Sequence, residues 1–150
     1  MDDKKVAIDI TSTQFSYREK DVTELFTFGD YIADRKNERY RITYKETADN
    51  GFAGSNVTLD IDGDKMVTLN RRGGALANLV IEKGRKHHCH YDTPYGDFMV
   101  GIAADTIRAD FNDNGGKLYL KYTVDINSSF MSENEMFINI KEVSGGLSRS

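Results

Sequence analysis

The chain has 150 residues and a formal net charge of −4, and its composition is 39% hydrophobic and 29% charged. These values are ordinary for a soluble globular protein and argue against a globally disordered chain. The single cysteine, Cys89, excludes an internal disulfide. A chain of this length buries roughly 68–70% of its unfolded surface, which is enough for a hydrophobic core without covalent cross-links.

The N-terminal residues Met-Asp-Asp-Lys-Lys lead directly into a strand pattern, without the apolar stretch of a signal peptide. No other segment approaches the roughly 18 consecutive apolar residues of a membrane-spanning helix. We therefore expect a cytoplasmic protein in which Cys89 is reduced.

Alternation of apolar and polar residues, which is typical of half-buried strands, recurs along the whole chain. The clearest run has apolar residues at every second position from Leu118 to Ile126. The alternation and the breaks between runs predict about ten strands, or eight to nine if some breaks lie inside long strands. We place these strands near residues 6–16, 22–35, 38–47, 54–61, 65–71, 75–82, 86–92, 96–110, 116–127 and 134–143.

Short turn sequences rich in Gly, Asn and Asp separate these runs. Because parallel strands need crossovers of a dozen or more residues, the short connections predict antiparallel neighbours. Closing the sheet removes its exposed edges, so we predict an all-β fold, a closed antiparallel up-and-down barrel. Gly29 and Gly101 lie inside long runs and are predicted to mark bends or bulges. We assign residues 1–143 to one domain and 144–150 to a flexible tail.

Three segments carry a resemblance to a known family. They are residues 40–46 (YRITYKE), residues 91–96 (YDTPYG) and residues 116–122 (GKLYLKY), with Arg71-Arg72-Gly73 between the first two. Over residues 5–143 the chain resembles the uncharacterised YwiB-like family of small bacterial proteins. The resemblance implies a lipocalin-like, calycin-type barrel, and it implies no assigned activity. The chain contains no Trp and therefore lacks the Gly-x-Trp signature of lipocalins proper.

The cluster His87-His88-Cys89-His90 has the residue types of a metal site. On a strand, His88, His90 and Asp92 would share one face and are weak candidates for zinc ligands. A polar strand face beside a turn accounts for the same residues, so we predict no metal. Cys89 is expected to pack in the interior, because nothing orients a catalytic pair with His87.

Residues 71–90 carry five Lys or Arg residues and one acidic residue, a net charge of +4. If adjacent hairpins gather these charges, the patch would suit an anionic ligand or partner. Ordinary solvated hairpins are the alternative. Glu46 is expected to pair with Arg35, Arg39 or Arg41 across a hairpin, at the rim or on the outer face. A pair inside the barrel would instead point to a ligand site, because an interior ion pair is costly.

We predict a non-catalytic protein that binds a small, partly apolar molecule, with or without an anionic group, inside the barrel. The expected ligand contacts are Arg71, Arg72, Tyr91, His90, Tyr44 and Glu46. The alternative is an interaction or scaffold module, monomeric or homodimeric, that uses exposed strands or the basic hairpins of residues 71–90. An enzyme is the third hypothesis. We predict no catalytic residue, no cofactor and no membrane partner, and the sequence pI of about 5.4 disfavours nucleic acid.

Overall fold

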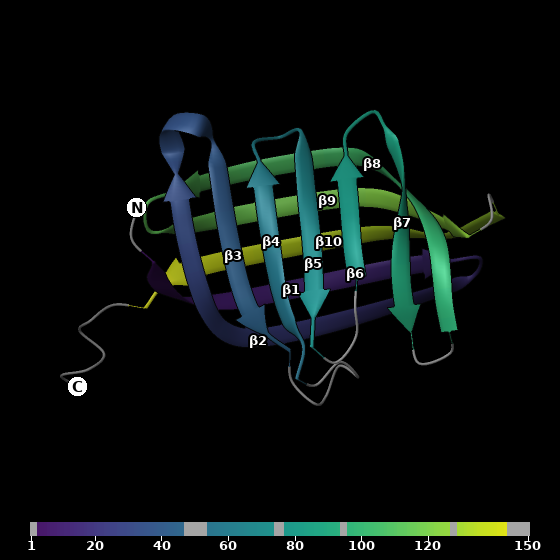
Figure 1. The fold of residues 1–150 in the computed structure, drawn as a ribbon, viewed down its shortest axis with the longest axis horizontal. Helices are drawn as coiled ribbons and strands as arrows, with labels where there is room; N and C mark the ends of the chain where they lie inside the picture. Colours follow the sequence, from purple (N-terminus) through teal and green to yellow (C-terminus); the bar gives the residue numbers. More distant parts are fainter. Residues whose placement is uncertain (1–2, 47–53, 74–76, 94–95, 127–128, 144–150) are drawn as a thin grey trace.

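The computed structural model describes residues 3–46, 54–73, 77–93, 96–126 and 129–143, with only the backbone at residues 91–93, 97 and 130–131. The described residues form ten β-strands and one short 3₁₀ helix, η1 (Arg35–Asn37) (Figure 1). The strands are β1 (Lys4–Ser16), β2 (Glu19–Asp34), β3 (Arg39–Lys45), β4 (Asn56–Asp62), β5 (Met66–Arg72), β6 (Ala77–Glu82), β7 (Lys86–Thr93), β8 (Gly96–Asn112), β9 (Gly115–Ile126) and β10 (Ser129–Glu142).

The strands form a closed barrel in which each strand pairs with its neighbours in sequence. All ten pairings are antiparallel, and the first and last strands close the barrel, from Val6 opposite Glu142 to Phe15 opposite Glu133. The prediction of a closed antiparallel up-and-down barrel is confirmed. Alternation of side chains and short turns are sufficient to specify this topology.

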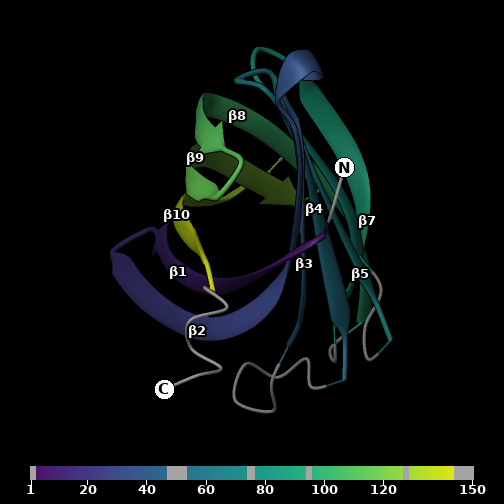
Figure 2. The same cartoon turned by 90° about the vertical axis from the view of Figure 1, so that its left-hand side faces the viewer.

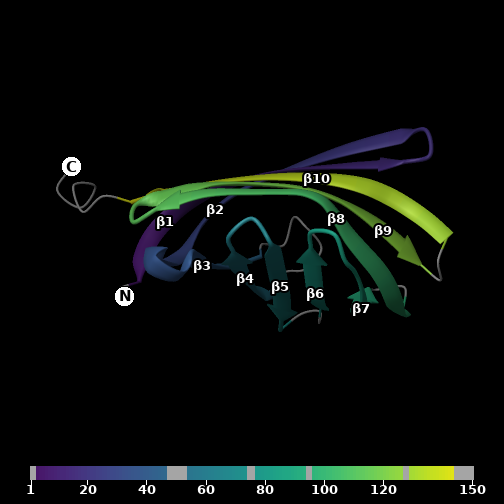
Figure 3. The ribbon, with the colours of Figure 1, turned by 90° about the horizontal axis from the view of Figure 1, so that it is seen from above.

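The barrel is flattened into two layers whose strands cross. The long strands β8, β9, β10, β1 and β2 run across the short strands β3 to β7 (Figures 1 and 2), and the two layers lie face to face when seen from above (Figure 3). Two strands belong to both layers. Residues 19–31 of β2 pair with β1 and residues 29–34 pair with β3, whereas β8 pairs with β7 over residues 96–103 and with β9 over residues 100–112.

Gly29 lies where β2 begins to pair with β3. A Cβ atom at this position would lie 2.2 Å from the backbone oxygen of Thr43 and 2.8 Å from Cδ1 of Ile8. Glycine is therefore required by the close approach of the strands, as the prediction of a bend implied.

Gly101 does not mark the bulge of β8. The register of β8 shifts between Ala104 and Thr106 instead. A Cβ atom at Gly101 would lie 2.5 Å from Cε of Lys86 and 2.6 Å from Oδ1 of Asp125. The missing side chain makes room for the ion pair between Lys86 and Asp125.

Two strands begin three or more residues earlier than predicted. β10 starts at Ser129 instead of residue 134, and β2 starts at Glu19 instead of residue 22. Residues 19–21 are all charged, and residues 129–133 (SFMSE) interrupt the alternation of apolar and polar residues. Backbone hydrogen bonding to a neighbouring strand does not depend on this pattern, and β10 continues past a register shift between Phe130 and Ser132. Residues 144–150, expected to form a flexible tail, lie outside the described residues.

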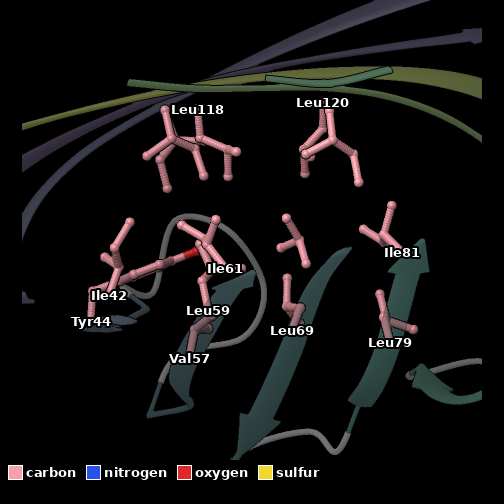
Figure 4. Close-up of a cluster of buried hydrophobic side chains, with 14 of the residues drawn as sticks. Ile42, Tyr44, Val57, Leu59, Ile61, Leu69, Leu79, Ile81, Leu118 and Leu120 are labelled. Carbon is pink, nitrogen blue, oxygen red and sulfur yellow. The ribbon is translucent and has the colours of Figure 1, made fainter. Parts of the chain in front are cut away.

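The hydrophobic core lies between the two layers. Leu118 and Leu120 of β9 face side chains from the short strands, among them Ile42, Leu59 and Ile61 (Figure 4). These five side chains are at most 2% exposed. In the part of the chain that the structure describes, no helix has the length and apolar character needed to span a membrane.

Candidate functional site

Charged and polar side chains are rare in the barrel interior. Among the described residues, four polar side chains are buried: Glu46, Ser55, Arg71 and Ser132. Three of these four gather at one end of the short strands. Glu46 directly follows β3, Ser55 directly precedes β4, and Arg71 lies near the end of β5. The inward direction of Arg71 follows from alternation, because the side chains of Val67 and Leu69 on the same strand are also buried.

Arg71 and Glu46 form a two-point ion pair. Nε of Arg71 donates a hydrogen bond to Oε1 of Glu46 at 2.7 Å, and Nη2 donates to Oε2 at 3.3 Å. The two side chains are 10% and 7% exposed. This fork geometry is the strong form of an arginine–carboxylate interaction. The backbone N–H of Glu46 also donates to the carbonyl oxygen of Ser55 at 2.8 Å, which joins the end of β3 to the residue before β4.

The prediction that Glu46 pairs with Arg35, Arg39 or Arg41 is wrong. Glu46 lies two residues beyond the buried Tyr44 and therefore shares its inner face. The three arginines instead form ion pairs outside the core, with Asp113, Asp62 and Asp60 respectively.

Tyr44 lies beside the ion pair. It is opposite Val57, which in turn is opposite Arg71, so one row of the sheet carries all three residues. Burial raises the pKa of the Tyr44 phenol, the negative charge of Glu46 raises it further, and the positive charge of Arg71 acts in the opposite direction. The phenol is therefore neutral at physiological pH and offers a hydroxyl group as hydrogen-bond donor and acceptor.

The apolar side chains near the ion pair differ in how completely they are buried. Leu69, Leu79 and Ala77 retain 6–8% of their surface in contact with water, whereas Ile42 and Val67 retain none. Leu69 and Leu79 point into the barrel (Figure 4). The arrangement combines an apolar wall, a two-point ion pair and a neutral phenol.

The structure brings together three of the six predicted ligand contacts, namely Tyr44, Glu46 and Arg71. It separates two others from them, because the side chains of Arg72 and His90 are exposed. Each of these two residues directly follows a buried residue, Arg71 or Cys89, and so faces outward. The backbone of the sixth, Tyr91, lies opposite Ala77 and Phe98, and its side chain is outside the described part.

The three histidines at positions 87, 88 and 90 do not form one site. Nε2 of His87 lies 2.7 Å from Oε1 of Glu82, and His88 is exposed, like His90. The described residues contain no group of three His, Cys, Asp or Glu placed to hold a metal ion, and the side chain of Asp92 is not among them. Cys89 is buried, as predicted, and its sulfur accepts a hydrogen bond from the backbone of Val80 at 3.3 Å.

The basic segment does not form one patch. Arg71 is opposite Ala77 at one end of the β5–β6 pair, and Glu82 is opposite Met66 at the other end. Lys83, Arg85 and Lys86 follow Glu82 and therefore lie far from Arg71 and Arg72 along the strands. The expectation that adjacent hairpins would gather these charges is wrong, because an antiparallel strand carries its two ends to opposite sides of the sheet.

Sequence reasoning selected Glu46 and Arg71 separately and missed their contact. A signal was nevertheless present. Each residue continues an apolar alternation, Glu46 after Tyr44 and Arg71 after Leu69, so each places a charge on an inward position. Two inward charges of opposite sign on nearby antiparallel strands are an indication of pairing.

Comparisons with known proteins agree with the fold. The crystal structure of the YwiB protein from Bacillus subtilis is similar to this structure with a TM-score of 0.80 and 16% sequence identity, and the match covers 95% of this chain and 94% of that chain. At this identity the likeness shows a shared fold. Among curated proteins, none matches the sequence. The model of a family described as a domain of unknown function, DUF1934, matches residues 8–138. The chain therefore belongs to the DUF1934 family.

Proposed function

We propose that this protein is a non-catalytic binding protein that holds a small, partly apolar molecule at the Arg71 end of the barrel. The observation that carries the proposal is the ion pair of Arg71 and Glu46, buried in an otherwise apolar interior. Barrels of this size enclose either a packed core or one small ligand.

The energetics of the pair favour a role in recognition. Removing two charges from water costs several kcal/mol for each ion, and well-packed apolar residues often stabilise a protein as well or better. Stability alone therefore gives little reason to keep Glu46 and Arg71 inside the barrel. A polar ligand group that hydrogen-bonds to the pair would give such a reason.

The chemistry of the three inward side chains suggests the ligand class. Nε and Nη2 of Arg71 are both bonded to Glu46, so the pair offers no free fork, and the Glu46 carboxylate would repel a ligand anion. A ligand hydroxyl group could donate to Glu46 and accept from the phenol of Tyr44. The partly accessible Leu69 and Leu79 would contact an apolar body. We therefore favour a medium-chain alcohol or a molecule of similar shape.

The first experiment is native mass spectrometry of freshly purified protein, followed by titration with decanoate and with decanol. We expect either a retained small molecule or binding of decanol, with decanoate binding more weakly. A bare-chain mass together with no binding of either compound would contradict the proposal.

A pair of double variants separates binding from folding. Glu46→Leu with Arg71→Met removes the interior pair, and Arg41→Met with Asp60→Leu removes an exposed pair with a 2.7 Å contact on the same layer. We expect the interior double variant to fold and to lose binding, and the exposed double variant to bind as the wild type does. Equal binding by the two double variants would count against a role for Arg71 and Glu46.

The alternative, a protein-interaction module, is favoured by a separate feature, the outer edge of β2. The two functions can coexist, because this edge and the Arg71 end of the barrel use different residues.

A further inference from the structure

One strand has an unpaired edge. Residues 19–28 of β2 pair with β1 on one side, and β3 joins the other side only from Gly29 onward. Within the described ranges, no strand covers the outer edge of residues 19–28. The β1–β2 hairpin reaches the far end of the long-strand layer (Figures 1 and 3), and every residue from Glu19 to Glu24 is exposed.

This edge also exposes large apolar side chains. Val22, Phe26 and Phe28 are 55%, 60% and 61% exposed, and they share the outer face because they lie at even positions. The Phe26 and Phe28 rings make an edge-to-face contact with 5.3 Å between their centroids. The same edge carries charges of both signs, at Glu19, Lys20, Asp21 and Glu24. Charges protect an exposed strand edge from pairing unless complementary charges lie opposite them.

From this pattern we infer that a second copy of the chain pairs with residues 18–26 in antiparallel orientation, about a two-fold axis at Val22. The barrels would then share one continuous sheet through their β2 strands. In an isologous contact of this kind both copies use the same segment, and if residue i of one copy faces residue j of the other, residue j of the first faces residue i of the second.

Symmetry limits the possible registers. A two-fold axis perpendicular to the sheet puts the outer faces of both copies on the same side of the shared sheet. Directly opposite residues of an antiparallel pair also point to the same side. An outward residue must therefore face an outward residue, so the axis passes through one residue of the strand.

Charge complementarity selects Val22 as that residue. With Val22 on the axis, Lys20 of each copy faces Glu24 of the other, and Arg18 faces the Phe26 ring. Opposite charges and a cation over an aromatic ring are favourable cross-strand partners. At the centre, Val22 of one copy packs against Val22 of the other.

The neighbouring registers are less favourable. An axis at Thr23 places Lys20 opposite Phe26 and Val22 opposite Glu24. An axis at Asp21 or at Glu24 places two like charges directly opposite each other, which destabilises a pair of strands.

Sedimentation equilibrium with charge variants tests both the partner and the register. We expect the wild type to dimerise reversibly. Lys20→Glu or Glu24→Lys alone should weaken the dimer by about tenfold or more, because two attractive contacts become repulsive. The double swap of Lys20→Glu with Glu24→Lys should restore it. An equimolar mixture of the two single variants should form heterodimers. The Lys20→Glu variant is acidic at both positions 20 and 24, and the Glu24→Lys variant is basic at both, so opposite charges face each other only in the mixed dimer.

A cysteine cross-link gives an independent readout. Val22→Cys lies on the proposed axis and should form an intermolecular disulfide under mild oxidation, whereas Glu24→Cys, which faces Lys20, should cross-link far less. Circular dichroism confirms that each variant is folded, which we expect because all substituted side chains are exposed. A wild type that stays monomeric throughout the concentration range would overturn the inference and leave the edge to a different partner. Single charge variants that dimerise like the wild type would also overturn it.

Discussion

Tyr31 donates its phenolic hydrogen to the backbone carbonyl oxygen of Asn112 at 2.7 Å, and this contact ties β2 to the end of β8. Tyr31 also stacks on Tyr40, with 6.4 Å between ring centroids, and lies next to Phe111. An aromatic cluster thus fills the barrel end opposite to the one that holds Arg71. The two ends of one interior differ in chemistry, aromatic at one and ionic at the other.

Replacing Tyr31 with Phe should lower the free energy of unfolding by about 0.5–1.5 kcal/mol, because the ring packing is kept and one hydrogen bond is lost. Urea denaturation monitored by circular dichroism measures this loss. An unchanged midpoint would show that the bond to Asn112 contributes nothing to stability.

Stability should fall in alkaline solution. Burial is the main cause that raises the pKa of both Tyr31 and Tyr44 above the ordinary value of 10.0. In the unfolded chain these phenols ionise near pH 10, whereas in the folded protein they stay protonated to higher pH. Their contribution is therefore complete below about pH 10 and is lost as the pH rises above it. Urea midpoints between pH 8 and pH 11 should decrease, and Tyr31→Phe and Tyr44→Phe should each flatten this decrease. A decrease of the same steepness in both variants would assign it to other groups.

Gly29→Ala should destabilise the protein by about 1–3 kcal/mol through overpacking. The new Cβ would meet the backbone oxygen of Thr43 at 2.2 Å, and a backbone atom of a paired strand cannot move aside easily. Gly101→Ala is the comparison, because its Cβ would meet the ends of the Lys86 and Asp125 side chains, which can rotate. Thermal unfolding should show the larger loss for Gly29→Ala. Equal losses would contradict this account of the strand crossing.

Removing only one partner of the interior ion pair should strongly lower the free energy of unfolding. Arg71→Met alone or Glu46→Leu alone is expected to lower the free energy of unfolding by about 3–5 kcal/mol, because each leaves a buried charge without its partner. The double variant should lie close to the wild type or above it, since no charge is then left inside. Arg41→Met is the exposed control and should cost at most about 1 kcal/mol. Single interior variants with losses as small as this control would mean that the pair is hydrated in solution.

The barrel could be predicted from the sequence because the features that specify it are local. Alternation determines which residues face inward, and short turns make neighbours antiparallel, so residues such as Leu118 and Leu120 were placed correctly. The early start of β10 at Ser129 was missed because the alternation is interrupted where the register shifts between Phe130 and Ser132. The position of the β8 bulge was missed because register shifts leave little trace in composition.

The candidate site was predicted only in part. Tyr44, Glu46 and Arg71 were chosen as contacts, but the pairing of Glu46 with Arg71 depends on the register of three strands, which local sequence does not contain. Arg72 and His90 were chosen for their charge. Their positions directly after Arg71 and Cys89 already placed them on the opposite face. The alternation of side chains along a strand was therefore a better guide to the site than charge.

The pairing of β1 with β10 has a consequence for biosynthesis. The backbone N–H of Val143 donates to the carbonyl oxygen of Lys5 at 2.8 Å, so the two ends of the described barrel are joined directly. During translation β1 emerges first, and one of its two edges stays open until β10 leaves the ribosome. Pairings between such distant segments form slowly, and open edges expose the nascent chain to misassembly. We expect the barrel to close only after synthesis of β10.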